Sequence, residues 1–361
     1  MQLQEIFCKN LRNLVEQKVV LNAGMNVFHG VNGSGKTSFL EGIHLLTTGK
    51  SFRNHLTSQI VTHDADELCI NGLLIDRDQD SHTSLAIIKG RKTNQLKINQ
   101  KKETKLSTLA RIAPMLVITQ ETQKLLQDGP QWRRRFIDWG LFHVEQQFSN
   151  TWLDFNKALK HRNRLLQNGI SKEDKHFILW TENVANLGNQ LTKFRQHYLI
   201  ELAEFIQHIS AELLDNVKIE IIFKKGWKKD SDLKTALIES YSKDLLAKTT
   251  HVGPQRADFI CKFQSRKANG YVSRGQQKLI IYVLILAQVC HLKQKIDKDV
   301  ILLIDELGAE LDESNLKQLL VILEKYLSQT FITTANAKLI PMHVLTQCKM
   351  FHVEQGMINA A

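Results

Sequence analysis

A single nine-residue stretch limits what this chain can fold into more than any other part of it. Residues 30–38 fit the phosphate-binding loop pattern G-x-x-x-x-G-K-[ST] without a mismatch, and they read Gly30, Val31, Asn32, Gly33, Ser34, Gly35, Lys36, Thr37 and Ser38. Alternating apolar residues in 25–29 predict a strand before the loop, and apolar residues at a 3–4 spacing in 38–46 predict a helix after it. A glycine turn with a chance lysine is the alternative, and these flanks make it the weaker one.

Each part of this loop has a chemical task around a polyphosphate. The glycines let backbone N–H groups point at the phosphates, and the following helix adds the positive end of its dipole. We expect Lys36 to reach the β- and γ-phosphates of a nucleotide and the Thr37 hydroxyl to bind Mg²⁺. The stretch therefore predicts ATP and Mg²⁺ as cofactors.

The charge balance indicates a polyanionic partner. The 361 residues include 48 Lys and Arg against 37 Asp and Glu, which gives a net charge of +11. Such a surplus is typical of a protein that meets nucleic acid, whereas solubility or lineage bias is the alternative explanation. An apolar content of 43% with only four prolines favours a folded protein with real cores.

Cysteines and apolar runs exclude other classes. The five cysteines are scattered without a C-x-x-C pair, which argues against a metal or redox site and favours a reducing cytoplasm. The beginning of the chain lacks the layout of a signal peptide. The longest apolar run, 279–292, is interrupted by Gln288 and is too short to span a bilayer, so we expect a buried helix and no membrane partner.

Patterns along the chain predict three segments of an α/β protein. We expect 1–112 to hold the first half of a nucleotide-binding core with antiparallel β segments, 113–215 to be an inserted all-helical lobe that begins near Leu116, and 216–361 to complete the core. A long apolar stripe in 184–213 favours a core face of the lobe over a coiled coil. The basic residues of 89–102 are equally consistent with a DNA-facing surface and a solvated hairpin, and the cationic helix around 156–164 leaves the same choice open.

An apolar run that ends in two acids completes the predicted site. Residues 300–304 are typical of a buried parallel strand, whose carboxyl end enters the nucleotide crevice of such a sheet. We expect Asp305 to help to hold Mg²⁺ and Glu306 to orient and polarise the attacking water, so that Lys36, Asp305 and Glu306 form the catalytic set. An acidic strand end that only caps a loop is the alternative.

A second anion site is predicted at the start of the helix that contains 279–292. Ser273, Gly275 and Gln276 offer a hydroxyl and free N–H groups at a helix N-terminus. The order of phosphate loop, this signature, acidic strand and a following D-loop with Asp312 is that of an ABC-type ATPase head. In that class the signature of one subunit closes over nucleotide bound by the other, so ATP holds a dimer together.

The combined motifs resemble those of the bacterial RecF family, whose members are recombination-mediator ATPases. The resemblance runs over essentially the whole chain and includes 30–37, 49–53, Gly129-Pro130 with Arg133-Arg134, 252–258, 273–276 and 303–306. It implies an SMC-like ATPase head without the long coiled coil, weak ATP hydrolysis and ATP-dependent dimerisation on DNA. It also implies binding to duplex DNA beside single-strand gaps, partnership with RecR and RecO, loading of RecA in gap repair and the SOS response, and a cytoplasmic, nucleoid-associated location.

Some positions depart from the family pattern. Gln120-Glu121 stands where a proline and an acid are more common, which leaves open whether Gln120 or Glu121 contacts the metal and water. Gln255 replaces a frequent histidine. We expect Arg53 near the nucleotide and Thr334 as a candidate sensor of the γ-phosphate.

Three functions compete at this point. A DNA-binding ATPase switch accounts for the joined ATP motifs and the net charge. The energising subunit of an ABC-type membrane transporter has the same motif order, although the large helical segment exceeds what a compact transport ATPase needs. A nucleotide-gated clamp with negligible turnover would differ from the first only in having an idle Glu306.

Overall fold

The chain folds into two compact units, and the second is inserted in sequence between the two parts of the first. Unit 1 comprises residues 1–122 and 296–361, and unit 2 comprises residues 123–295. The computed structural model describes residues 1–53, 56–76, 80–308, 311–341, 343 and 345–361. The sequence analysis expected a core formed by 1–112 and 216–361 with 113–215 inserted between them. That division remains a proposal.

Unit 1 contains two six-stranded sheets. The antiparallel sheet has the order β2 (Leu14–Val20), β1 (Gln2–Leu11), β4 (Glu67–Asp76), β5 (Ser81–Gly90), β6 (Asn94–Ile98) and β7 (Lys101–Glu103). The second sheet has the order β15 (Met357–Ala360), β14 (Cys348–Glu354), β3 (Met25–His29), β13 (Gln329–Thr334), β12 (Ile301–Ile304) and β8 (Met115–Ile118). Its strands are parallel except β15.

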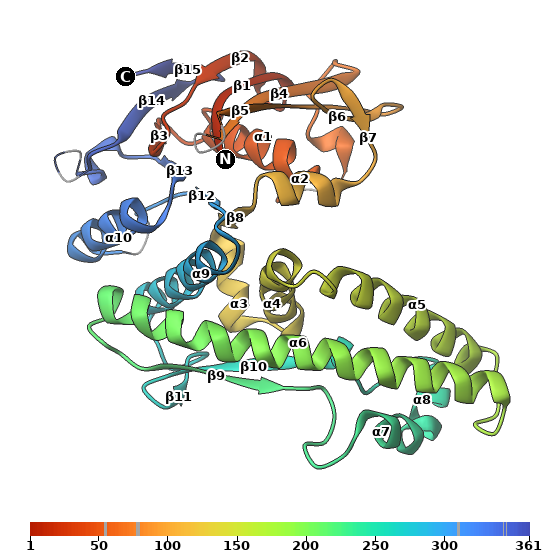
Figure 1. Cartoon of the computed structure of the whole chain (residues 1–361). Helices are drawn as coiled ribbons and strands as arrows, with labels where there is room; N and C mark the ends of the chain where they lie inside the picture. The colour runs from red at the N-terminus through yellow and green to blue at the C-terminus, as the bar shows by residue number, and fades with distance from the viewer. Residues whose placement is uncertain (54–55, 77–79, 309–310, 342, 344) are drawn as a thin grey trace. The chain divides into compact units, whose positions relative to one another are not determined.

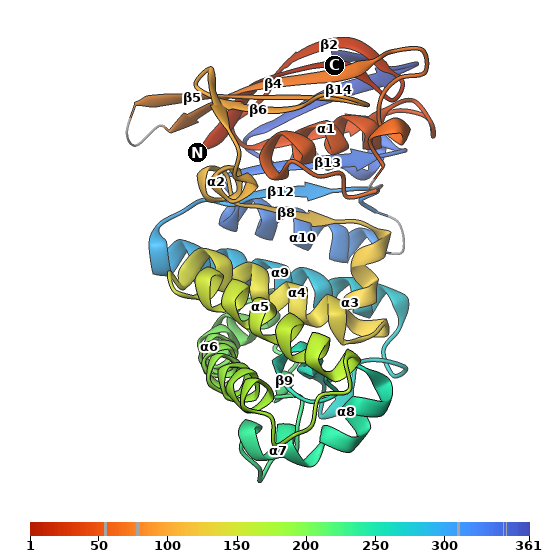
Figure 2. The same cartoon turned by 90° about the vertical axis from the view of Figure 1, so that its right-hand side faces the viewer.

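Helix α1 (Lys36–Thr48) lies between the two sheets (Figure 2). Ten of its thirteen residues are buried, because apolar side chains of both sheets join it in one core. Helix α10 (Glu313–Tyr326) covers the other face of the parallel strands (Figure 2). The remaining helical pieces of this unit are α2 (Leu106–Ile112), η1 (Thr57–Gln59), η4 (Ala337–Leu339) and most of η2 (Gln120–Gln123). The phosphate loop therefore starts from a sheet that cannot shift without disturbing a packed helix.

Strand β8 corrects one expectation. The sequence pattern predicted helical structure from near Leu116, but Met115–Ile118 pair with β12 in parallel register. Four apolar residues, two of them β-branched, suit a buried strand, and so short a run carries no period that distinguishes strand from helix. The strands β14 and β15 were also not anticipated.

Unit 2 is mostly helical (Figure 1). Its helices are α3 (Lys124–Gln127), α4 (Pro130–Val144), α5 (Phe148–Gln167), α6 (Lys175–Leu213), α7 (Leu233–Glu239), α8 (Tyr241–Ala247), η3 (Pro254–Arg256) and α9 (Arg274–Ile296). A small antiparallel sheet joins β11 (Arg266–Lys267), β10 (Asp258–Phe263) and β9 (Ile219–Lys224). The apolar stripe of α6 packs against α5, α4 and α7, which confirms the predicted core face.

Helix α9 is apolar because it is a core element. By length and composition alone it is the one helix in the described residues that qualifies as a candidate membrane span, yet 72% of its most apolar window is buried inside the protein. Buried core helices commonly pass such a test, so the observation is weak evidence for a membrane. The expected buried helix over 279–292 is confirmed.

Candidate functional site

The phosphate loop has the backbone geometry that its sequence predicts. Gly30, Gly33 and Gly35 have φ angles of 150°, 80° and 119°, a region that only glycine enters without strain. Gly35 is the N-cap of α1, so the free N–H groups of this helix lie at the loop. The result is a turn at a helix N-terminus, an arrangement that favours anion binding.

Lys36 lies folded against its own loop. Its side chain is only 6% exposed, and Nζ donates to the carbonyl oxygens of Gly30 (2.7 Å) and Val31 (2.8 Å). Burial lowers the pKa of Lys36, and the carboxylates of Glu306 and Asp305 oppose that shift. A phosphate that arrives in the loop offers the ammonium a stronger, charged acceptor than two carbonyls.

Asp305 is the centre of a hydrogen-bond network at the ends of the parallel strands. Its Oδ1 accepts from the hydroxyl of Thr37 (2.9 Å) and from that of Thr333 (2.7 Å). The Thr333 oxygen also accepts from the backbone N–H of Glu306 (2.8 Å). The network therefore links the phosphate loop to the tips of β12 and β13, as a site at the carboxyl ends of parallel strands requires.

Glu306 is held from a neighbouring strand end. Gln120 follows β8, and its Nε2 donates to Glu306 Oε2 (2.9 Å). Glu306 is exposed and has a φ of 60°, a strained conformation for a residue with this side chain. Strain of this kind concentrates at functional sites, which makes it an observation in favour of a catalytic role.

The oxygen atoms at this site suit a magnesium ion. Thr37 and Asp305 supply a hydroxyl and a carboxylate, the hard donors that Mg²⁺ prefers. In the described part of the chain no group of three or more His, Cys, Asp or Glu side chains gathers into a metal cluster. Mg²⁺ bound together with phosphate needs only one or two protein oxygens, so this absence does not conflict with such a site.

Thr333 is a residue of the candidate site that the sequence analysis did not single out. The sequence pointed to Thr334, but the Thr334 hydroxyl donates to Asn336 O (3.2 Å) and accepts from Asn336 N (3.3 Å), within its own loop. Thr333 is fully buried and reaches Asp305 instead. Strand alternation predicts that neighbouring threonines face opposite ways, and only the three-dimensional position of Asp305 decides which one matters.

Two segments distant in sequence support the phosphate loop. Asn13 donates to Gly33 O (3.3 Å) and accepts from the Ser38 hydroxyl (3.0 Å). The backbone N–H of Gly356, at the turn between β14 and β15, donates to Ser34 O (2.8 Å). The Ser34 hydroxyl is buried with no hydrogen-bond partner among the described residues, which leaves it available to a ligand in the loop.

Arg53 is placed by a loop that is anchored to α1. Its side chain is exposed, and its backbone N–H donates to the Ser51 hydroxyl (3.0 Å). Ser51 in turn donates to Glu41, a buried carboxylate that also forms an ion pair with Arg12. The anchor explains the loop geometry, and a nucleotide contact by Arg53 remains a prediction.

The signature residues form a helix start in unit 2. Gln276 N donates to the Ser273 hydroxyl (3.2 Å), and Ser273 N donates to Gln276 Oε1 (3.0 Å). This reciprocal pair is a capping box at the beginning of α9. Gly275 between them is half-buried, whereas Ser273 and Gln276 are exposed.

Asp312 also caps the start of a helix, in unit 1. It is the N-cap of α10, where its carboxylate accepts from the backbone N–H of Asn315 (2.8 Å) and from the Ser314 hydroxyl (2.9 Å). These hydrogen bonds lower the pKa of Asp312. Its expected D-loop role at a nucleotide remains a prediction.

Comparisons with known proteins show the family to which this chain is similar. A family model described as the RecF/RecN/SMC N terminal domain matches residues 2–359. Proteins named "DNA replication and repair protein RecF" from Shewanella denitrificans and Shewanella baltica are each 37% identical to this chain over 360 residues, 99% of both chains.

Solved structures are similar over the same length. The recombination mediator protein RecF-ATP of the RecFOR pathway is 27% identical, with a TM-score of 0.86 over 100% of this chain and 97% of that one. An Smc head bound to the C-winged helix domain of ScpA is 14% identical, with a TM-score of 0.60 over 100% of this chain and 97% of that one, and it is similar in fold alone.

Proposed function

The chain belongs to the RecF family of DNA replication and repair proteins, and from this premise we propose that it is an ATP-dependent DNA-binding switch. One observation carries the proposal. Thr37, Gln120, Asp305, Glu306 and Thr333 converge at the carboxyl ends of four parallel strands, next to a preformed phosphate loop. That arrangement suits phosphoryl transfer, in which positioning and charge stabilisation supply most of the catalysis.

Each residue has a task in ATP hydrolysis. Lys36 and the loop N–H groups would hold the phosphates, Thr37, Asp305 and Gln120 would hold Mg²⁺, and Glu306 would orient the attacking water. The metal, when bound, neutralises charge on the phosphate oxygens. Of Gln120 and Glu121, we assign Gln120 the contact with the metal and water, because the Gln120 side chain is hydrogen-bonded to Glu306. We expect slow ATP turnover, which would set the lifetime of the ATP-bound state.

ATP also controls assembly in this proposal. Ser273 and Gln276 lie exposed at the start of α9, and a helix start of this kind binds anions well. We infer that these residues of one protomer, with Gly275 between them and Asp312, close over the nucleotide of a second protomer. Arg53 contacts nucleotide from the anchored loop that follows α1. Nucleotide binding then favours a homodimer, and hydrolysis releases it.

DNA is the proposed partner of the dimer. The net charge of +11 supports binding to a polyanion, and relatives are named for DNA replication and repair. We propose that the dimer binds duplex DNA beside single-strand gaps, acts with RecR and RecO to load RecA, and serves gap repair and the SOS response. Gap repair of this kind takes place in the cytoplasm, with the protein on the nucleoid when it is bound to DNA. None of the relatives described above is a transporter subunit, so no observation favours that alternative.

The solution mass of the Glu306→Gln variant tests the switch. Light scattering with MgATP should show a doubled mass, because the variant binds nucleotide but does not hydrolyse it. Adding Ser273→Arg should restore the single mass, since it obstructs the proposed composite site. An unchanged mass of Glu306→Gln at saturating ATP and DNA would reject ATP-driven dimerisation. Equal ATP turnover in wild type and Glu306→Gln would instead favour the clamp with an idle Glu306.

A further inference from the structure

Two sequence motifs that the ATPase site does not use meet in unit 2. Arg133, near the start of α4, forms an ion pair with Asp258, at the start of β10, through bonds of 2.5 and 3.2 Å. Arg134 donates to the carbonyl oxygen of Ala257 (2.8 Å). Arg133 and Arg134 are therefore bonded directly to the 252–258 loop, although the two segments lie far apart in the sequence.

A third arginine holds the same loop. Arg195 of α6 donates to both carboxylate oxygens of Asp138 (2.8 and 2.9 Å) and to Pro254 O (2.7 Å). Asp138 thus forms an ion pair with Arg195, and Asp258 forms one with Arg133. Arg134 has no carboxylate within ion-pair distance among the described residues. Burial lowers the pKa of Arg134, the charges of Arg195 and Arg256 act in the same direction, and Asp138 and Asp258 oppose them.

A pocket opens beside this surplus charge. It has a volume of about 240 Å³, and its charged, polar and aromatic lining includes Gln131, Arg134, Arg135, Asp138, Trp152, Asn156, Arg195 and Gln255. Arg135 is exposed, and the Trp152 side chain is 41% exposed. The Gln255 Oε1 atom is buried with no hydrogen-bond partner among the described residues. Arg195 and Asp138 in the lining are paired with each other. The pocket therefore offers the guanidinium groups of Arg134 and Arg135, an aromatic face and an unused acceptor.

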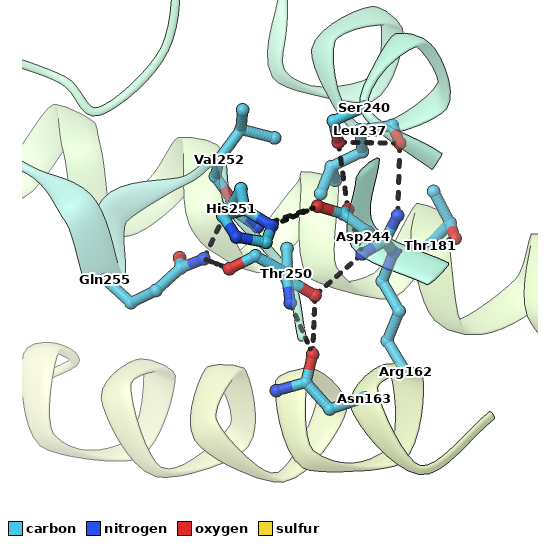
Figure 3. A network of polar contacts seen from close by, with 10 residues as sticks. All are labelled: Arg162, Asn163, Thr181, Leu237, Ser240, Asp244, Thr250, His251, Val252 and Gln255. Atoms are coloured by element: carbon cyan, nitrogen blue, oxygen red, sulfur yellow. Dashed lines mark hydrogen bonds and ion pairs between the residues drawn. The ribbon is translucent and has the colours of Figure 1, made fainter. Parts of the chain in front are cut away.

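The wall of the pocket is fixed by a buried network (Figure 3). Gln255 Nε2 donates to Val252 O (2.8 Å), and Thr250 accepts from Arg162 Nη1 (2.7 Å). Arg162 is fully buried and forms an ion pair with Asp244 (2.9 Å). A site held in this way needs little ordering when a ligand binds, which favours affinity.

We propose that this pocket binds a phosphate group of a nucleic acid strand, with Arg134 and Arg135 on the phosphate and Trp152 against an adjacent base. Guanidinium groups recognise phosphate by charge-assisted, often bidentate hydrogen bonds, and aromatic side chains stack on unpaired bases. The inference rests on the proposed DNA-binding function and gives it a local contact. A free polyphosphate shares the same chemistry and is the other source of such a group.

Tryptophan fluorescence provides a local test. All five tryptophans lie between residues 132 and 227, so unit 1 and its phosphate loop contain none. An oligo-dT of about 12 nucleotides, within known site sizes for single-strand binding, should change the emission saturably without ATP. Trp152→Phe should reduce that change, and Trp132, whose ring centroid lies 5.4 Å from Cζ of Arg135, accounts for any remainder. Arg135→Gln should weaken binding about tenfold, the effect of losing one charged hydrogen bond.

A matched variant controls for net charge. Arg266→Gln removes an exposed charge from β11, outside the pocket and outside the cationic helix 156–164, and should leave the affinity near that of wild type. A change in tryptophan emission with pyrophosphate but not with oligo-dT would support a phosphate site in this pocket. It would reject a nucleic acid as the source of the phosphate. Equal losses in Arg135→Gln and Arg266→Gln, or a response that Trp152→Phe does not reduce, would overturn the pocket. ATP-dependent dimerisation and DNA binding that persist in that case would leave the proposed switch intact.

Discussion

Thr333 donates its hydroxyl to Asp305 across 2.7 Å while it accepts from the backbone N–H of Glu306 across 2.8 Å. One buried hydroxyl thus fixes both acids of the proposed site, the first through its side chain and the second through its backbone. Glu306 has a φ of 60°, and the bond to Thr333 helps to hold it in this strained conformation.

Replacing Thr333 by valine should impair hydrolysis more than nucleotide binding. Thr333→Val keeps the shape of the side chain but leaves the Glu306 N–H unpaired, at a cost of about 1–3 kcal/mol. We expect turnover to fall about tenfold, equivalent to ~1.4 kcal/mol in the barrier, with a similar affinity for MgATP. Steady-state hydrolysis and equilibrium titration measure the two quantities.

The neighbouring threonine is the control for that change. Thr334→Val removes a buried hydroxyl that contacts only Asn336 in the described structure, so turnover should stay within about twofold of wild type. A larger loss in Thr334→Val than in Thr333→Val would show that the wrong threonine has been assigned to the site.

The C-terminal turn should affect nucleotide affinity. Gly356 has a φ of 82°, and a Cβ at this position would lie 2.2 Å from Asn13 O. Gly356→Ala should therefore displace the turn, break its bond to Ser34 O and weaken MgATP binding by about tenfold, ~1.4 kcal/mol. Calorimetric titration with MgATP is the measurement.

Gly169→Ala is a matched control for Gly356→Ala. Gly169 has a φ of 71°, and a Cβ at this position would meet no atom within 4 Å among the described residues, so the substitution imposes comparable backbone strain without a clash. It should leave MgATP affinity unchanged. If both variants bind MgATP like wild type, the turn does not support the phosphate loop.

Local sequence patterns predicted the parts of the site, and strand order supplied what they could not. The phosphate loop and the acidic strand end are recognisable because each is set by a few consecutive residues. Gln120 and Glu306 are 186 residues apart, and they meet because β8 lies next to β12 in the sheet. No periodicity encodes that neighbour relationship, which also explains why Thr333, Asn13 and Gly356 were missed.

The ion pair between Arg162 and Asp244 should dominate the stability of unit 2. Both side chains are fully buried, so Arg162→Met leaves a buried carboxylate without its cation and should cost about 3–5 kcal/mol. Lys157→Met, on the same helix, breaks an exposed pair with Asp154 and should cost less than about 1 kcal/mol. Urea unfolding followed by tryptophan fluorescence measures both, and similar losses in the two variants would contradict this assignment.

Acid should destabilise unit 2 through His291. This residue is 3% exposed, and its Nδ1 has no hydrogen-bond partner among the described residues. Burial lowers the pKa of His291, Lys295 and His197 act in the same direction, and Glu201 opposes them. The folded state therefore binds this proton less readily than the unfolded state does, so the stability is present above the ordinary histidine pKa of about 6.5 and is lost as pH falls below it.

Unfolding free energies between pH 7.5 and 5, an interval that brackets the histidine pKa of about 6.5, measure the effect. Wild type should lose up to about 1.4 kcal/mol per pH unit for each such proton. His291→Gln keeps an amide near Glu201 but does not titrate, so its curve should be flatter. The pKa values of His29 and His44 are also lowered, and part of the slope should therefore remain. His176→Gln, an exposed change on α6, should follow wild type, and a curve for His291→Gln as steep as that of His176→Gln would exclude His291 as a source of the acid sensitivity.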